Sequence, residues 1–232
     1  MRRSAGARLA RALATAAALA VALPAPAARE TPPAAPRMDY VPPAPGTYVL
    51  QRIQRAPSGF VLESDGTARA FSEYTTGRIT LLALMYTYCT DRYGCPLAYD
   101  TFVEVRARLL KRPGIAARVR LVSLSFDPTN DTPAAMRLYG GKFVKPEGGL
   151  AWHFLTTSSV KALLPLLDGL GQDASIEVDA RGRPTRTINH NLKVFLIDRT
   201  GVVREIYSPA FLFPDVVMND IETLALEEKA GR

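Results

Sequence analysis

The two cysteines of the chain, Cys89 and Cys95, are the residues best suited to chemistry, and five residues lie between them. Thiolates attack disulfides and bind soft metal ions, so a close pair can serve either use. Two cysteines in an exported chain also suggest a structural disulfide, which stays open as the alternative. The loop between them can fold back far enough for a disulfide, with Gly94 available for a positive φ.

Elements of different kinds flank this loop. Residues 79–86 are almost unbroken apolar sequence, which is typical of a parallel strand that is covered on both faces. Pro96 suits the first turn of a helix, and Phe102, Val105 and Leu109 recur at helical spacing. The cysteines are therefore predicted on a strand-to-helix loop, where the positive end of the helix favours thiolate.

The rest of the chain alternates between strands and helices, and we expect an α/β, thioredoxin-like sandwich with a mixed central sheet, an N-terminal hairpin and a C-terminal helix. Turn and cap residues mark the boundaries. The expected elements are a hairpin around Asp65 and Gly66, a strand at 119–126, a helix capped by Asp131 or Thr132, a strand at 152–155, a helix capped by Ser158 or Ser159, a polar stretch with a turn at 182–184, strands at 192–197 and 202–207, and a helix capped by Asp215 that ends at Gly231.

The N-terminus predicts export. Residues 1–27 combine four arginines, a twelve-residue apolar run and small residues suited to cleavage. That run is short of the roughly 20 residues of a membrane span, so membrane association is expected only if the signal is not removed. Residues 28–46 are predicted to be a proline-rich linker, and residues 47–232 the folded domain. Much of the net charge of +7 lies in the signal, so nucleic acid is not an expected partner.

The chain has two histidines, His153 and His190. His190 is expected at the start of the strand at 192–197, on the sheet edge that carries the cysteines. Two thiolates and an imidazole match what Cu(I) prefers. His153 lies between Trp152 and Phe154, and strand alternation points it away from the face that they bury, which makes it a poor candidate for a ligand.

Several segments together resemble the Sco/SenC copper-chaperone family of thioredoxin-like proteins, over residues 59–226. Each segment alone is a weak signal, but their combination is specific. They are Tyr86-Thr87-Tyr88-Cys89 with Cys95-Pro96, Ser125-Phe126-Asp127-Pro128 with Asp131-Thr132-Pro133, Trp152 with Phe154-Leu155-Thr156, and His190 ahead of Val194-Phe195-Leu196-Ile197-Asp198 and Gly201.

The resemblance implies a periplasmic protein, tethered to the inner membrane if its signal is retained. It implies that copper, as Cu(I) or Cu(II), is bound by Cys89, Cys95 and His190, with Asp127 nearby. Such proteins deliver copper to the dinuclear centre of cytochrome c oxidase or reduce the thiols of the receiving subunit. The implied partners are therefore a copper-receiving cuproprotein and a copper donor or thiol reductant.

One departure from the family is visible, because the family places three residues between its cysteines and this chain has five. A changed ring size alters both the bite of a dithiolate and the stability of a disulfide. The alternative function is therefore a thiol-disulfide oxidoreductase in which Cys89 and Cys95 form the redox pair. Against it, no proline precedes His190 directly. A peroxidase is disfavoured because Thr87 lies two residues before Cys89, whereas that chemistry uses a threonine three residues before its cysteine.

Overall fold

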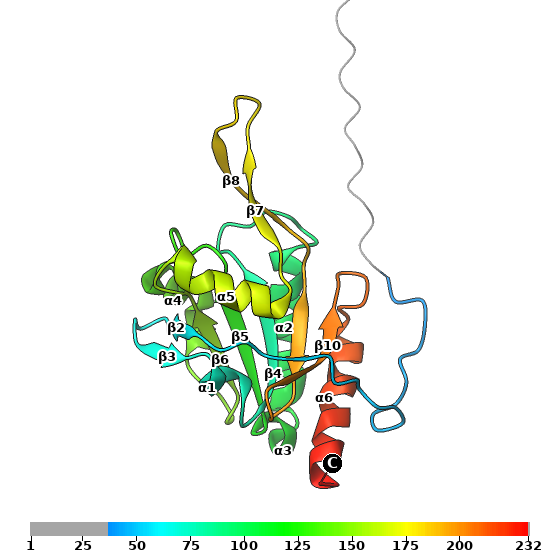
Figure 1. Ribbon diagram of the computed structural model, residues 1–232. Helices are drawn as coiled ribbons and strands as arrows, with labels where there is room; N and C mark the ends of the chain where they lie inside the picture. Colours follow the sequence, from blue (N-terminus) through cyan, green and yellow to red (C-terminus); the bar gives the residue numbers. More distant parts are fainter. Residues whose placement is uncertain (1–36, 232) are drawn as a thin grey trace, which may run out of the picture. The chain divides into compact units, whose positions relative to one another are not determined.

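The computed structural model describes residues 37–231, so the predicted export signal and the first part of the predicted linker lie outside the described residues. A six-stranded sheet forms the centre, in the order β1-β10-β9-β4-β5-β6 (Figure 1). Its strands are β1 (Gln54–Arg55), β4 (Ile79–Met85), β5 (Val119–Ser125), β6 (Ala151–Leu155), β9 (Val194–Ile197) and β10 (Val202–Tyr207).

Parallel strands occupy one half of this sheet and antiparallel strands the other. β4 runs parallel to β5, and β5 to β6, whereas β9, β10 and β1 pair in antiparallel fashion. Every residue of β4 and β5 is buried, as their unbroken apolar sequence predicts for strands covered on both faces. The predicted mixed α/β sandwich is confirmed.

The helices begin mostly at the residues that the sequence indicates. The Oγ1 of Thr132 accepts from the Ala135 N–H at 3.3 Å, and the Oγ of Ser159 accepts from the Ala162 N–H at 3.2 Å. The prediction that Asp215 is a cap was wrong, because Asp215 lies inside the first turn. The helices are α1 (Ser72–Thr75), α2 (Cys95–Leu110), α3 (Pro113–Ala116), α4 (Pro133–Gly140), the 3-10 helix η1 (Gly141–Val144), α5 (Val160–Leu170) and α6 (Pro214–Lys229).

Two hairpins lie outside the central sheet. The first, β2 (Phe60–Leu62) with β3 (Ala68–Ala70), confirms the predicted N-terminal hairpin. The second, β7 (Ala174–Val178) with β8 (Pro184–His190), projects from the body of the domain (Figure 1). Sequence analysis predicted only a polar stretch with a turn here. Apolar Ala174, Ile176 and Val178 alternate with polar residues in β7, a strand signal that the prediction missed, although every residue of the strand is exposed.

This second hairpin changes the place of His190. The histidine ends β8 and does not open the next strand, which begins at Val194. His190 therefore lies at the base of a projecting hairpin, and its position depends on how that hairpin joins the sheet.

The N-terminal segment of the domain packs against the C-terminal helix. The Asn219 side-chain amide donates to the Pro43 carbonyl at 2.9 Å, and the Gly46 N–H donates to the Thr223 hydroxyl at 3.0 Å. The end of the segment predicted as a linker thus contacts α6. Within residues 37–231, no helix has the length and apolar character needed to cross a bilayer.

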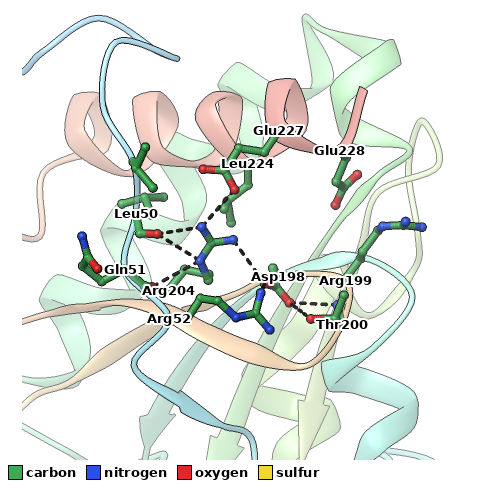
Figure 2. Close-up of a pocket in the computed structure, with 11 residues that line it drawn as sticks. Leu50, Gln51, Arg52, Asp198, Arg199, Thr200, Arg204, Leu224, Glu227 and Glu228 are labelled. Carbon is green, nitrogen blue, oxygen red and sulfur yellow. Dashed lines mark hydrogen bonds and ion pairs between the residues drawn. The ribbon is translucent and has the colours of Figure 1, made fainter. Parts of the chain in front are cut away.

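A pocket of about 580 Å³ lies between this segment, α6 and the turn after β9 (Figure 2). Arg204 is buried in it and donates to the Leu50 carbonyl at 2.6 Å, to Glu227 at 2.9 Å and to Asp198 at 3.2 Å. These bonds join three separate parts of the chain, so we interpret the arginine as a structural tie.

Candidate thiol and metal site

The loop from β4 to α2 brings the two cysteines together at the carboxyl edge of the parallel strands. The Cys89 N–H donates to the Tyr86 carbonyl at 3.2 Å, and the Gly94 N–H donates to the Asp91 carbonyl at 3.0 Å, so the loop folds back twice. Gly94 has a φ of −95°, so the positive φ considered for it was wrong. Both cysteines are free thiols, with Cys89 half-buried and Cys95 buried at the first residue of α2.

The surroundings shift the pKa values of the two thiols in opposite directions, downward for Cys89 and upward for Cys95. The hydrogen bond from the Cys95 side chain is the main cause that lowers the pKa of Cys89. Burial raises this pKa, but hydrogen bonds from the backbone N–H groups of Cys95 and Asp91 and from the Tyr86 side chain lower it further, to about 5. The hydrogen bond to Cys89, burial and the negative charge of Cys89 raise the pKa of Cys95 well above its usual range. At neutral pH the pair is therefore a thiolate at Cys89 and a thiol at Cys95.

A pocket of about 290 Å³ lies beside the pair and gives a partner access to it. Its walls contain both thiols and the aromatic side chains next to them. The lining residues are Tyr86, Thr87, Cys89, Cys95, Pro96, Tyr99, Asp100 and Tyr139.

Asp131 anchors the start of the loop to the neighbouring strand. Its carboxylate accepts from the Thr87 N–H at 3.0 Å, from the Thr87 hydroxyl at 2.5 Å and from the Ser125 hydroxyl at 2.6 Å. Beyond its place in the segment that resembles the family, sequence analysis gave Asp131 only the role of a possible helix cap, which Thr132 fills. The signal that could have located it is its place just after β5, at the edge where β4 also ends.

A second anchor runs through Tyr88, the residue before the first cysteine. Its hydroxyl donates to Asp127, which also accepts from the Asn130 amide at 2.6 Å. The guanidinium of Arg186, on β8, lies 4.5 Å from the centre of the Tyr88 ring. Asp127 thus lies near the site, as expected, and supports it through Tyr88. The arginine links the cysteine loop to the β7–β8 hairpin.

Tyr86 stands between the thiols and the histidine. It is buried, its side chain hydrogen-bonds Cys89, and its ring centre lies 6.0 Å from that of His190. Burial first, and then the hydrogen bond and charge of Cys89, raise the pKa of Tyr86 to about 12, so the phenol keeps its proton. Sequence analysis named Tyr86 only as part of the segment that resembles the family and gave it no role, because an aromatic residue at the end of an apolar strand is indistinguishable from core.

His190 presents one ring nitrogen that is ready to act as a ligand. Its Nδ1 lies 2.9 Å from the Ile188 carbonyl oxygen, which can only accept, so Nδ1 carries the proton of the neutral ring. Nε2 then holds the lone pair. This nitrogen is buried and has no hydrogen-bond partner in the described part of the chain. A backbone carbonyl that fixes the tautomer in this way is the usual companion of a metal-binding histidine.

The structure brings the two thiols together but does not add His190 to them. Within residues 37–231, no group of three or more His, Cys, Asp or Glu side chains lies close enough to hold a metal ion. The three-ligand set Cys89, Cys95 and His190 stays a prediction. His153 lies elsewhere, with its Nδ1 2.9 Å from Glu63, and it points away from the buried Trp152 and Phe154, as expected.

Comparisons with known proteins identify the family to which this fold belongs. A sequence model of the SCO1/SenC family matches residues 54–226, well over half of the chain. The chain belongs to the SCO1/SenC family. A search of curated proteins returned no match.

Solved structures of SCO1/SenC relatives share the fold. ScoI of Arabidopsis thaliana with copper bound is 16% identical, with 74% of this chain and 98% of that chain covered and a TM-score of 0.60. ScoI of Bradyrhizobium japonicum with copper bound is 22% identical, with 72% and 98% covered and a TM-score of 0.55. BsSco, described as a member of the Sco family of cytochrome c oxidase assembly proteins that has a disulfide switch, is 19% identical, with 77% and 98% covered and a TM-score of 0.57.

Proposed function

We propose that this SCO1/SenC protein is an exported copper metallochaperone that assists the assembly of the copper centre of a respiratory oxidase or related cuproprotein. Copper is its cargo, as Cu(I) or Cu(II), and Cys89, Cys95 and His190 are its ligands. The copper-bound relatives and the oxidase-assembly relative support this assignment. The partners are the copper-receiving subunit and a copper donor or thiol reductant.

The observation that carries the proposal is the unpartnered Nε2 of His190. A buried nitrogen without a hydrogen bond costs stability, so its retention beside Tyr86, whose side chain hydrogen-bonds Cys89, suits a nitrogen kept for a ligand. The Cys89 thiolate already has the charge that Cu(I) prefers, and Cys95 loses its proton when metal binds. Arg186 and Tyr86 connect the hairpin with the loop, and a shift of the hairpin toward the loop would complete the site.

Anaerobic titration of the reduced mature protein with Cu(I), against a competing chelator, tests the proposal. We expect one tight equivalent in the natural protein, and a loss of at least tenfold in affinity in Cys89→Ser and in His190→Ala. His153→Ala is the matched control, because that ring is hydrogen-bonded to Glu63 away from the thiols, and it should bind as the natural protein does. Equal affinity in His190→Ala and the natural protein would reject the histidine as a ligand.

The thiolate and thiol pair also favours a second function, a thiol-disulfide oxidoreductase that acts on cysteines of the copper-receiving partner. Cys89 would attack the partner disulfide to give a mixed disulfide, and Cys95 would then attack Cys89 to release the reduced partner. In this case Cys89→Ser abolishes the reduction of a disulfide peptide while His190→Ala leaves it intact. Loss of the reduction in both variants would contradict this dithiol exchange, which gives His190 no part.

The location proposed is the periplasm, with the inner membrane as the anchor if the signal is kept. Fractionation of cells and determination of the N-terminal residue of the purified protein test both parts. A protein found in the cytoplasmic fraction with Met1 intact would contradict export.

A further inference from the structure

A third pocket lies at the amino-terminal edge of the parallel strands, away from the cysteines. It has a volume of about 400 Å³ and contains three arginines. Arg78 comes just before β4, and Arg120 is the second residue of β5. Because β4 spans about 20 Å at the usual rise per residue, this pocket and the thiol site lie at opposite ends of one strand. The lining residues are Glu63, Arg69, Glu73, Tyr74, Arg78, Arg120, Ala151 and His153.

Arg120 is a buried cation without a counter-ion. Its side chain is among the buried charged groups at 8% exposure, and no carboxylate forms an ion pair with it in the described residues. Its guanidinium donates to the Glu73 carbonyl and, at 2.5 Å, to the Thr76 carbonyl. Its Nε is buried and has no partner. Neutral carbonyls satisfy part of its hydrogen-bonding capacity but do not cancel its charge.

The carboxylates of the pocket are already engaged by other groups. Glu63 accepts from the Tyr74 hydroxyl at 2.8 Å and lies 2.9 Å from His153. Glu73 pairs with Arg69 and accepts from the Ala70 N–H at 3.2 Å. The charge of Arg120 is therefore left to the solvent or to a bound ion.

Arg78 adds a second positive charge beside the first. The only hydrogen bond that its exposed side chain makes in residues 37–231 is to the Gly149 carbonyl, at 3.1 Å. Burial and, next, the charge of Arg78 lower the pKa of Arg120 to about 10, which expresses the mutual repulsion of the two guanidinium groups. An anion between them would relieve both the burial and the repulsion.

We propose that this pocket binds a small oxyanion of the phosphate or sulfate type, held by Arg78 and Arg120. Guanidinium groups pair with such oxyanions through two parallel hydrogen bonds, and the exposed Arg78 is the side of the pocket from which the ion enters. The expected ligand is the free ion and not the phosphate of a lipid headgroup, because Arg120, which must contact it, lies inside the fold. The proposal does not depend on the copper function, which uses the opposite edge of the sheet.

Titration of the mature protein with inorganic phosphate tests this site, with phosphorus NMR and thermal unfolding as readouts. Sodium chloride and sodium acetate at matched ionic strength separate a specific ion from screening. We expect phosphate to raise the melting temperature beyond chloride and acetate, and Arg78→Gln to weaken phosphate binding at least tenfold. Arg181→Gln, an exposed arginine at the tip of the β7–β8 hairpin, is the matched control and should bind phosphate as the natural protein does.

Two control measurements, a Cu(I) titration of the variant and a vesicle sedimentation, accompany this experiment. Arg78→Gln leaves every buried group in place, so it should fold, and its Cu(I) titration should match that of the natural protein. Sedimentation with phosphatidylglycerol vesicles tests whether a lipid headgroup is the source of the phosphate. Identical phosphate curves for the natural protein and Arg78→Gln would overturn the proposal, as would binding to vesicles without binding of inorganic phosphate.

Discussion

The carboxylate of Asp131 holds Thr87 by two hydrogen bonds, one from its backbone N–H at 3.0 Å and one from its hydroxyl at 2.5 Å. Thr87 lies two residues after the end of β4, in the loop that leads to Cys89, and Asp131 belongs to the loop after β5. The cysteine loop is therefore fixed by a completely buried acid of another segment. This bond sets where the first thiol stands relative to the sheet.

Replacement of this acid should destabilise the whole domain. Asp131→Ala leaves the Thr87 and Ser125 donors without their acceptor, at a cost of about 3 kcal/mol in the free energy of unfolding. Urea denaturation of the reduced protein measures it. Asp168→Ala, at an exposed position of α5, is the control and should change the free energy by less than about 0.5 kcal/mol. Equal free energies of unfolding for the two variants would show that the hydrogen bonds of Asp131 do not stabilise the domain.

Cys89 should be the reactive thiol. Because its pKa is about 5, its reaction with iodoacetamide should be nearly constant from pH 7 to pH 9 and fall to half near pH 5. Cys95 is buried and keeps its proton, so it should stay unmodified over this range. Mass spectrometry of the alkylated peptides distinguishes the two. Preferential labelling of Cys95 would reverse the assignment of thiolate and thiol.

The same acidity links the stability of the reduced protein to pH. The folded pKa of Cys89 lies below that of an unfolded thiol, near 8.5, so the native state binds fewer protons between these values. The stability that the thiolate contributes is fully present above about pH 8.5 and is lost as the pH falls toward 5. Comparison of unfolding free energies at pH 5.5 and pH 8 in the natural protein and in Cys89→Ser isolates this contribution. The serine variant should lose less of its stability over the same range.

Tyr86 should tune the thiolate through its hydroxyl group. Tyr86→Phe removes the hydrogen bond to Cys89 and keeps the buried ring, so the pKa of Cys89 should rise and the midpoint of its alkylation profile should move to higher pH. Tyr139→Phe is the control, because Tyr139 lines the same pocket without a hydrogen bond to Cys89. An unmoved midpoint in Tyr86→Phe would exclude the phenol from this role.

The hydrogen bonds and ion pairs of Arg204 should contribute to the free energy of unfolding and not to copper binding. Arg204→Ala leaves the carboxylate of Glu227 without its cation and leaves Asp198 with only the exposed Arg52, 3.7 Å away, which should cost about 3 kcal/mol. Urea denaturation measures the loss, and Arg199→Ala, an exposed neighbour, should have little effect. If both variants unfold alike, the carboxylates find other partners, and the pocket in Figure 2 is not held by Arg204.

The sequence by itself determined the buried central strands, two helix starts and the place of the thiols between a strand and a helix. Continuous apolar runs predict β4 and β5 because buried parallel strands exclude polar residues, and Thr132 and Ser159 predict helix starts because their hydroxyls cap free N–H groups. The position of the cysteines between a strand and a helix follows from the same local signals. Such features can be predicted from a sequence because residues that are close in the chain are also close within one strand or helix.

Only the tertiary structure decided how the site is supported. Most residues of the projecting β7–β8 hairpin are exposed, so its sequence does not indicate how the hairpin joins the sheet, and the place of His190 at its base could not be predicted. Asp131 meets Thr87 and Arg120 stays without a carboxylate because strands far apart in the chain lie side by side. The anchoring of the loop and the unpaired charge of Arg120 depend on such distant neighbours, since electrostatic energy follows distance in space and not separation along the chain. The acidity of Cys89 and the tautomer of His190 depend instead on Cys95 and Ile188, which are close in the chain.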